Sequence, residues 1–211
     1  ISVIPYILTE MADKTKTGNV LNLYKTLGET PRERLERLRA QKPLYAYETL
    51  SYAGRLDPMA EGVLICLVGS TNNHRDVYLD QSKEYVLDVL FGFSTDTYDV
   101  LGRVMETGNA PLNRASILKG LNEFRGLLAQ EYPPYSSKTV EGKSLFEWAR
   151  KGAIDSISIP SKTITVYDIT LEEVYKVKEP ILLEYISNSV EKVQGDFRQE
   201  EILLAWRRYL K

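Results

Sequence analysis

Residues 54–64 read GRLDPMAEGVL, and the turn and strand within them are the starting point for predicting the fold. Gly54 and Pro58 favour turns, and they bracket an aspartate, Asp57. The apolar run at residues 62–68 follows directly and predicts a buried strand. A loop held by such a scaffold is a common place for functional side chains. Asp57 therefore has two interpretations, as a cap for the turn before Pro58 or as a reactive carboxylate at the edge of a cleft.

Outward from this stretch, strands and helices alternate in no regular order. Residues 20–24 predict a strand, and Thr30 is the expected N-cap of a helix that ends near residue 40. Alternating apolar residues predict a strand at residues 83–93, β-branched residues predict strands at 162–174 and 181–187, and a short strand is expected at 138–140. Helical spacing predicts helices at residues 113–124, 144–151 and 199–209. We expect one domain over residues 1–211 with an α+β fold, a mixed, mainly antiparallel sheet flanked by helices.

The composition of the 211 residues excludes several classes of site. Hydrophobic residues make up 43% and charged residues 27%, a balance typical of a globular protein. One cysteine and one histidine exclude an internal disulfide, a Cys-rich zinc site and a histidine cluster. The longest apolar run, residues 63–68, is far shorter than a membrane span, and residues 1–8 lack the basic flank of a signal peptide. We therefore expect a cytoplasmic protein that does not associate with a membrane.

The net charge of −2 gives no overall basic surface, but two segments are locally basic. Residues 32–42 hold five basic and two acidic side chains, and residues 138–151 hold four basic and two acidic ones. Each segment by itself is typical of a solvent-exposed helix face. Only a reason to bring such charges to one surface favours nucleic-acid binding.

That reason comes from a resemblance carried by several blocks of residues. Residues 54–64 closely resemble the G-T-L-D-P-x-A-x-G-V-L signature of the TruB-type tRNA pseudouridine synthases, with Arg55 in place of the threonine. Residues 20–25, 83–85 and 92–102 are similar to three further blocks of that family, in the same order. Residues 133–152 resemble the block that forms a thumb, which grips the tRNA stem-loop. Residues 195–199 are a weaker match to the family's G-T-Y-I-R block.

The resemblance implies an enzyme that isomerises a uridine of tRNA, U55 of the T-loop, to pseudouridine with Asp57 as the catalytic residue. It implies that neither a metal nor an organic cofactor is required. Tyr52 stands where the family has a histidine, and Arg198 follows the aromatic residue directly rather than two positions later. Implied active-site contacts are Tyr85, Tyr52, Phe197 and Arg198, with Arg198 holding the carboxylate ionised; Arg55 is a second candidate for that role, which this sequence itself offers. Implied RNA contacts are Lys25, Lys138, Lys143, Arg150 and Lys151.

The thumb insertion, at about residues 131–152, also implies how the protein works. Relatives that act within guide-RNA particles lack this insertion, whereas stand-alone enzymes carry it. We therefore expect a monomer that binds the T-arm stem-loop of tRNA without a guide RNA or a protein partner. The chain stops at Lys211 without the family's C-terminal RNA-binding domain, so it is expected to be a minimal catalytic domain or a truncated one.

Two alternatives of other classes stay open. A catalytically inactive tRNA-binding or RNA-folding module would bind RNA without forming product. A metal-dependent phosphate-ester enzyme would use Asp96 and Asp99, although two carboxylates in a polar loop are more often turn and capping groups. Such an enzyme would lose activity with a chelator, whereas the synthase would not.

Overall fold

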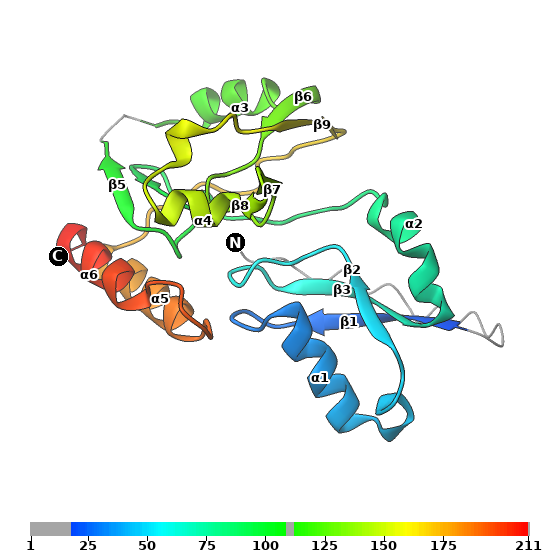
Figure 1. Cartoon of the computed structure of the whole chain (residues 1–211). Helices are drawn as coiled ribbons and strands as arrows, with labels where there is room; N and C mark the ends of the chain where they lie inside the picture. The colour runs from blue at the N-terminus through cyan, green and yellow to red at the C-terminus, as the bar shows by residue number, and fades with distance from the viewer. Residues whose placement is uncertain (1–17, 109–111, 211) are drawn as a thin grey trace. The chain divides into compact units, whose positions relative to one another are not determined.

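The computed structural model describes residues 18–108 and 112–210 (Figure 1). Contacts divide the chain into two compact units. Unit 1 consists of residues 1–90 and 184–203, and unit 2 of residues 91–183 and 204–211. Helices and antiparallel strands occur together, which confirms the predicted α+β class. In the described residues, the strands form four small antiparallel sheets rather than one mixed sheet.

Unit 1 is built on a three-stranded sheet whose order is β1-β3-β2. Strand β1 (Gly18–Lys25) pairs along its whole length with β3 (Gly62–Gly69). Strand β2 (Leu50–Ala53) pairs with residues 65–68 of β3. The predicted strands at residues 20–24 and 62–68 are confirmed. The core contains the buried side chains of Leu23, Leu35, Leu38, Leu64, Cys66 and Val68.

Helix α1 (Pro31–Gln41) follows β1 and begins where the sequence predicts. The Thr30 hydroxyl accepts a hydrogen bond from Glu33 N at 3.2 Å, and Thr30 N donates to the Glu33 carboxylate at 2.7 Å. This reciprocal capping box satisfies two backbone donors that the first helical turn leaves free. Three short helical segments follow: η1 (Pro43–Tyr45) lies between α1 and β2, and η2 (Ser70–His74) and α2 (Arg75–Leu79) come directly after β3.

The described residues of unit 2 form three two-stranded sheets. Strand β4 (Phe93–Thr95) pairs with β5 (Val104–Thr107), β6 (Gly126–Glu131) pairs with β9 (Ser161–Val166), and β7 (Thr139–Val140) pairs with β8 (Lys143–Ser144). Helices α3 (Arg114–Asn122) and α4 (Leu145–Arg150) confirm two predicted helices, and η3 (Ile154–Ser156) follows α4.

The two C-terminal helices, α5 (Glu179–Glu191) and α6 (Gln199–Tyr209), each contribute residues to both units. The predicted helix at residues 199–209 is confirmed. Its Trp206 side chain, 1% exposed, anchors it in unit 2, where Nε1 donates to the Val100 carbonyl at 3.1 Å and the ring packs against Phe93. None of the helices in the described ranges is both long and apolar enough to cross a membrane.

Two strand predictions were wrong, and a third, at residues 162–174, is correct only as far as Val166, where β9 ends. Residues 181–187 lie within α5, where Ile186 and Val190 are buried one helical turn apart and Pro180 occupies the first turn. Residues 81–92 form no strand, and β4 begins only at Phe93. The alternating apolar residues of that segment have no described strand beside them, so Tyr85, Leu87, Val89 and Phe91 are about half exposed.

Candidate active site

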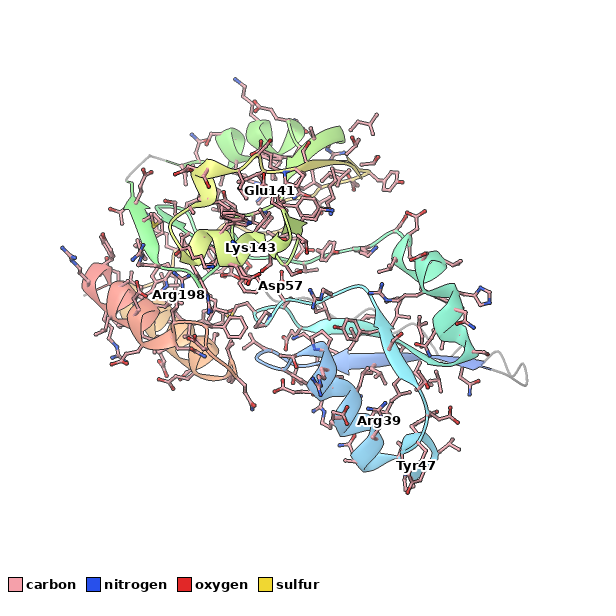
Figure 2. All side chains as sticks on the ribbon, viewed as in Figure 1. Arg39, Tyr47, Asp57, Glu141, Lys143 and Arg198 are labelled. Atoms are coloured by element: carbon pink, nitrogen blue, oxygen red, sulfur yellow. The ribbon has the colours of Figure 1, made fainter. Side chains whose placement is uncertain are left out.

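Asp57 lies in the connection between β2 and β3, where Figure 2 labels it. Ala60 N donates to the Asp57 carbonyl at 3.0 Å, which closes a turn with Pro58 in its second position. Met59 is 2% exposed and anchors this turn in the unit. The Asp57 carboxylate itself is exposed and forms no hydrogen bond or ion pair with another described residue. The backbone therefore holds the turn, and the carboxylate is not used to cap it.

A second contact fixes the Asp57 turn from the other side. Gly28, in the loop after β1, donates its backbone N–H to the Pro58 carbonyl at 2.8 Å. Gly28 has a φ of +86°, and a Cβ atom on it would collide with the backbone of Lys192. Only glycine fits this position, because both the dihedral angle and the space exclude a side chain.

Lys25, the last residue of β1, comes three residues before Gly28 and is completely buried. Its Nζ donates to the carbonyl oxygens of Thr26 at 3.0 Å and Glu29 at 2.6 Å. Burial lowers the pKa of Lys25, and the negative charges of Glu29, Asp57 and Glu61 act against that shift. The ammonium is thus a buried positive charge in the electrostatic neighbourhood of Asp57.

This position corrects the prediction that Lys25 contacts RNA. A fully buried ammonium that already donates to two carbonyl oxygens is not available to a phosphate. The prediction placed the residue correctly at the end of its strand. It missed the burial because the two carbonyl oxygens that accept from Lys25 Nζ are backbone groups, which no side-chain pattern in the sequence reveals.

Tyr85 is the second predicted site residue that the structure brings close to Asp57. The pKa of its phenol is raised, first by burial of the hydroxyl and second by the negative charge of Asp57. Its side chain as a whole remains 59% exposed. Tyr85 therefore has a phenol that feels the charge of Asp57, and more than half of the residue is exposed.

Tyr52 has a different place in unit 1. It lies on β2 opposite Cys66 and packs against the buried cluster of the sheet. Its carbonyl accepts a hydrogen bond from Arg75 Nε at 2.9 Å. No electrostatic or hydrogen-bond contact between Tyr52 and Asp57 is found in the part of the chain that the structure describes.

Phe197 and Arg198 precede α6. Phe197 N donates to Gln199 Oε1 at 3.0 Å, and the Arg198 carbonyl accepts the first helical hydrogen bond from Ile202. Arg198 has a φ of +62°, a left-handed conformation that is uncommon for a residue other than glycine. Neither Arg198 nor Arg55 forms an ion pair with Asp57 within the described ranges.

Two side chains near the site were not predicted. Tyr24 and Glu61 lie beside the ends of β1 and β3, and their side chains are hydrogen-bonded. Burial, then the Glu61 charge, raises the pKa of Tyr24. A tyrosine at a strand end gives no sequence signal of such a contact.

Unit 1 also has a hollow of about 420 Å³. It is lined by residues that include Glu29, Arg37 and Lys192 but not by Asp57.

In unit 2, the predicted thumb contains the hairpin formed by β7 and β8, followed by α4. Its two turn residues, Glu141 and Gly142, have φ values of +50° and +79°. Leu145 is completely buried, and its N–H donates to the Lys138 carbonyl at 2.9 Å. Ser144 and Glu147 form a capping box at the start of α4, which lowers the pKa of Glu147.

The four predicted RNA contacts of the thumb are all exposed. Lys143 Nζ lies 4.7 Å from the centroid of the Trp148 ring, and Arg150 lies 6.0 Å from that of Phe146 (Figure 2 labels Lys143). Trp148 Nε1 donates to the Val140 carbonyl at 3.1 Å, which fixes the ring on the hairpin. Lys138 lies over Tyr132 at 5.3 Å, and Lys151 is exposed at the end of α4.

Asp96 and Asp99 are occupied by turn contacts. Asp96 Oδ1 accepts from Arg103 N at 2.9 Å, and Asp99 Oδ1 accepts from Thr97 Oγ1 at 2.7 Å and Leu101 N at 3.0 Å. The loop thus uses both carboxylates in the way such residues commonly stabilise turns. Across the described ranges, no group of three or more His, Cys, Asp or Glu side chains is arranged to hold a metal ion.

Comparison with known proteins shows which family this chain resembles. Residues 42–199 match the family described as TruB family pseudouridylate synthase, N-terminal domain. The chain is 37% identical over 153 residues to tRNA pseudouridine synthase B of Caldanaerobacter subterraneus, covering 72% of this chain and 52% of that protein. It is 38% identical over 136 residues to the enzyme of the same name from Aquifex aeolicus, covering 64% and 44%. It is 30% identical over 166 residues to tRNA pseudouridine synthase 4 of Schizosaccharomyces pombe, covering 79% and 40%.

The chain spans about half the length of the curated relatives that it matches. The matched region nevertheless includes the Asp57 turn, Tyr85 and the hairpin with its exposed basic side chains. From this coverage and these identities, the chain belongs to the TruB family of pseudouridylate synthases.

Proposed function

We propose that the protein is a tRNA pseudouridine synthase that isomerises a uridine of the T-loop, U55, with Asp57 as its catalytic residue. The observation that carries the proposal is that the Asp57 turn is held by its backbone and leaves the carboxylate exposed. Backbone hydrogen bonds on both sides hold it, yet its carboxylate is exposed and uncommitted within the described residues. A scaffold that does not use the carboxylate for folding leaves it available for chemistry.

The reaction requires a carboxylate of this kind. It breaks the C1′–N1 glycosidic bond, turns the base, joins C5 to C1′ and transfers the C5 proton, with no net gain or loss of atoms. A carboxylate serves either by adding to the substrate or by removing a proton from the ribose. Neither route calls for a metal or an organic cofactor.

Neighbours of Asp57 support the same reaction. The target nucleotide must leave its stack, and an aromatic side chain commonly supports the flipped base. Tyr85 suits this role, because it is largely exposed and the charge of Asp57 acts on its phenol. Lys25 contributes a buried positive charge in the electrostatic neighbourhood of Asp57 rather than a contact with RNA.

Binding is assigned to the thumb. Its exposed basic side chains suit phosphates of the T-arm stem-loop, which is recognised by its folded shape. We propose that the two units act as one catalytic domain, as a cytoplasmic monomer without a guide RNA or a protein partner. The insertion between residues 131 and 152 is the feature that supports this autonomy.

The test is to map pseudouridine in a T-arm hairpin RNA incubated with the purified chain. Wild-type protein should form it, whereas Asp57→Asn should form none while binding RNA within a few-fold of wild type, because a catalytic group acts mainly on the transition state. Asp80→Asn, an exposed aspartate after α2, is the matched control. Turnover near wild type in Asp57→Asn would remove Asp57 from the mechanism. Tight binding without product by the wild type would instead favour the inactive RNA-binding module.

A further inference from the structure

Tyr132 follows β6 in unit 2, and the ammonium groups of two lysines lie over its aromatic ring. Lys138 Nζ lies 5.3 Å from the ring centroid, and Lys162 Nζ lies 5.8 Å from it. Both distances are within the range of cation–π attraction. Lys138 belongs to the thumb, whereas Lys162 lies on β9 and was not among the predicted RNA contacts. We call these three residues the Tyr132 site.

Backbone contacts fix the ring from both directions. Tyr132 N donates to the Pro160 carbonyl at 3.1 Å, which continues the pairing of β6 with β9 that Figure 1 shows. Pro133 and Pro134 follow, and each proline restricts the backbone. Ser136 N donates to the Pro133 carbonyl at 3.0 Å, closing a turn that brings the chain back towards Lys138.

Strand register accounts for the second lysine. Lys162 pairs with Gln130, two residues before Tyr132. Side chains at diagonal positions on neighbouring antiparallel strands are within reach when one is long and the other aromatic. The ring therefore receives one cation from the loop that follows it and another from the adjacent strand.

The two ammonium groups have no anionic partner in the part of the protein that the structure describes. Both lysines are exposed, and neither ammonium group forms an ion pair or a hydrogen bond with another described residue; Lys138 donates only its backbone N–H, to Ser136 Oγ. The face of an aromatic ring attracts cations but does not neutralise them. Two like charges held at one ring repel each other, so an anion that contacts both would relieve this repulsion.

We propose that the Tyr132 site binds one phosphate of the RNA backbone between Lys138 and Lys162. The inference rests on the proposed function for the identity of the ligand. A phosphodiester fits the site because an ammonium acts as a compact point charge towards phosphate. The exposed cations of the neighbouring hairpin extend the same path for an RNA backbone. Lys162 thereby extends the binding surface beyond the thumb insertion.

The experiment measures binding of a labelled T-arm hairpin RNA over KCl concentrations from about 50 to 300 mM. The proteins are the wild type, Lys138→Gln, Lys162→Gln and the double variant, with Lys119→Gln on α3 as an exposed control in the same unit. Each single site variant should bind several-fold more weakly than the control. Because one phosphate is shared, the double variant should lower the log–log salt slope by about one unit in total, not two.

Two results would overturn the proposal. One is binding by Lys162→Gln that matches Lys119→Gln at every salt concentration. The other is a double variant whose loss equals the product of the single losses with a slope change of about two, since this would mean two separate phosphates. Unchanged thermal unfolding of both site variants checks that neither result arises from misfolding.

The ring has its own test. Tyr132→Phe keeps the aromatic face and should bind RNA like wild type, whereas Tyr132→Leu should bind as weakly as the double lysine variant. Equal losses in both would assign the effect to the hydroxyl and overturn the role of the ring.

Mapping pseudouridine with the same preparations separates this inference from the proposed function. Normal product from the wild type together with unchanged binding by Lys162→Gln overturns the Tyr132 site and leaves the function in place. No product from the wild type, with binding still dependent on Lys162, overturns the function and leaves the phosphate site.

Discussion

Among single residues, Lys25 has the largest expected influence on the Asp57 loop. We predict that Lys25→Met, which keeps the apolar stem but removes the ammonium, lowers the free energy of unfolding by about 2–4 kcal/mol. The carbonyl oxygens of Thr26 and Glu29 would lose their buried donor, and nearby carboxylates would lose a positive charge. Urea unfolding measures the loss.

Lys42→Met is the control for this substitution, because Lys42 is exposed and should change the free energy of unfolding by less than about 0.5 kcal/mol. Suppose instead that both variants unfolded at the urea midpoint of the wild type. The free energy gained by no longer burying a charge in Lys25→Met would then equal the free energy lost with the hydrogen bonds. The stabilising role given to Lys25 would then be wrong.

A second residue-scale prediction concerns Cys66 and pH. Burial raises the pKa of the Cys66 thiol to about 11, compared with about 9 in an unfolded chain. Between these values the unfolded chain has released the proton and the folded chain has kept it, so stability falls as the pH rises. The loss attributable to this thiol should approach about 3 kcal/mol at the upper end.

Urea unfolding of the wild type and Cys66→Ala at several pH values from about 8 to 11 checks this expectation. The cavity that alanine leaves in the core of the sheet costs the same stability at every pH. The difference between the two proteins should shrink with rising pH, since only the wild type has the thiol. Parallel pH profiles would contradict the buried-thiol account.

Single residues also show what the sequence could predict about the site. The turn that holds Asp57, directly before β3, was predicted correctly because its signal is local, a turn-forming residue on each side and a strand directly after. The neighbourhood of Lys25 was missed because its carboxylates come from separate parts of the chain, Glu29 and Glu33 after β1 and Asp57 and Glu61 before β3. Only the folded backbone shows that they surround one ammonium.

On the scale of elements, the turn of the β7–β8 hairpin is under backbone constraint. Glu141 and Gly142 both have positive φ values, as in the two-residue turns that match the twist of a hairpin. Gly142→Ala should therefore destabilise the protein by about 1 kcal/mol, and Glu141→Asn should stabilise it by a smaller amount.

Thermal unfolding followed by circular dichroism should show the melting temperature fall by about 3 °C for Gly142→Ala and rise slightly for Glu141→Asn. Lys143 follows this turn directly, so Gly142→Ala should also weaken RNA binding. Similar melting temperatures for both variants would mean that the hairpin turn does not limit stability.

Elements differ in how far they could be predicted. Helix α1 carries its own start signal in Thr30, Pro31 and Glu33, and it begins as predicted. The segment that became α5 is a short apolar run rich in isoleucine and leucine, for which periodicity alone does not separate a strand from a helix. Residues 81–92 have strand-like alternation, but a strand also needs a neighbouring edge, and the sequence does not say where one lies.

For the whole molecule, the proposed chemistry and the proposed grip on RNA belong to different units. Asp57 is in unit 1, whereas Lys138, Lys143, Arg150 and Lys151 are in unit 2. Replacing these four side chains by alanine should weaken T-arm binding strongly and flatten its salt dependence, by roughly one unit of log–log slope for each phosphate that is no longer bound. Asp57→Asn should leave that slope unchanged.

A salt titration of the wild type, the four-fold variant and Asp57→Asn measures both effects side by side. The variant with four alanine substitutions should still form pseudouridine at saturating RNA, because the substitutions weaken binding and leave Asp57 in place. Coincident salt slopes for the four-fold variant and the wild type would show that RNA is held elsewhere.

The tight fit of Gly28 against Lys192 bears on how the protein is made on the ribosome. Unit 1 joins residues 1–90 to residues 184–203, so the loop that supports Asp57 stays without its packing partner while some 90 intervening residues are synthesised. Residues 91–183 leave the exit tunnel first, and domains generally fold in the order in which they emerge. A nascent chain arrested before residue 184 would therefore carry the complete Asp57 motif but lack the backbone against which that motif is positioned.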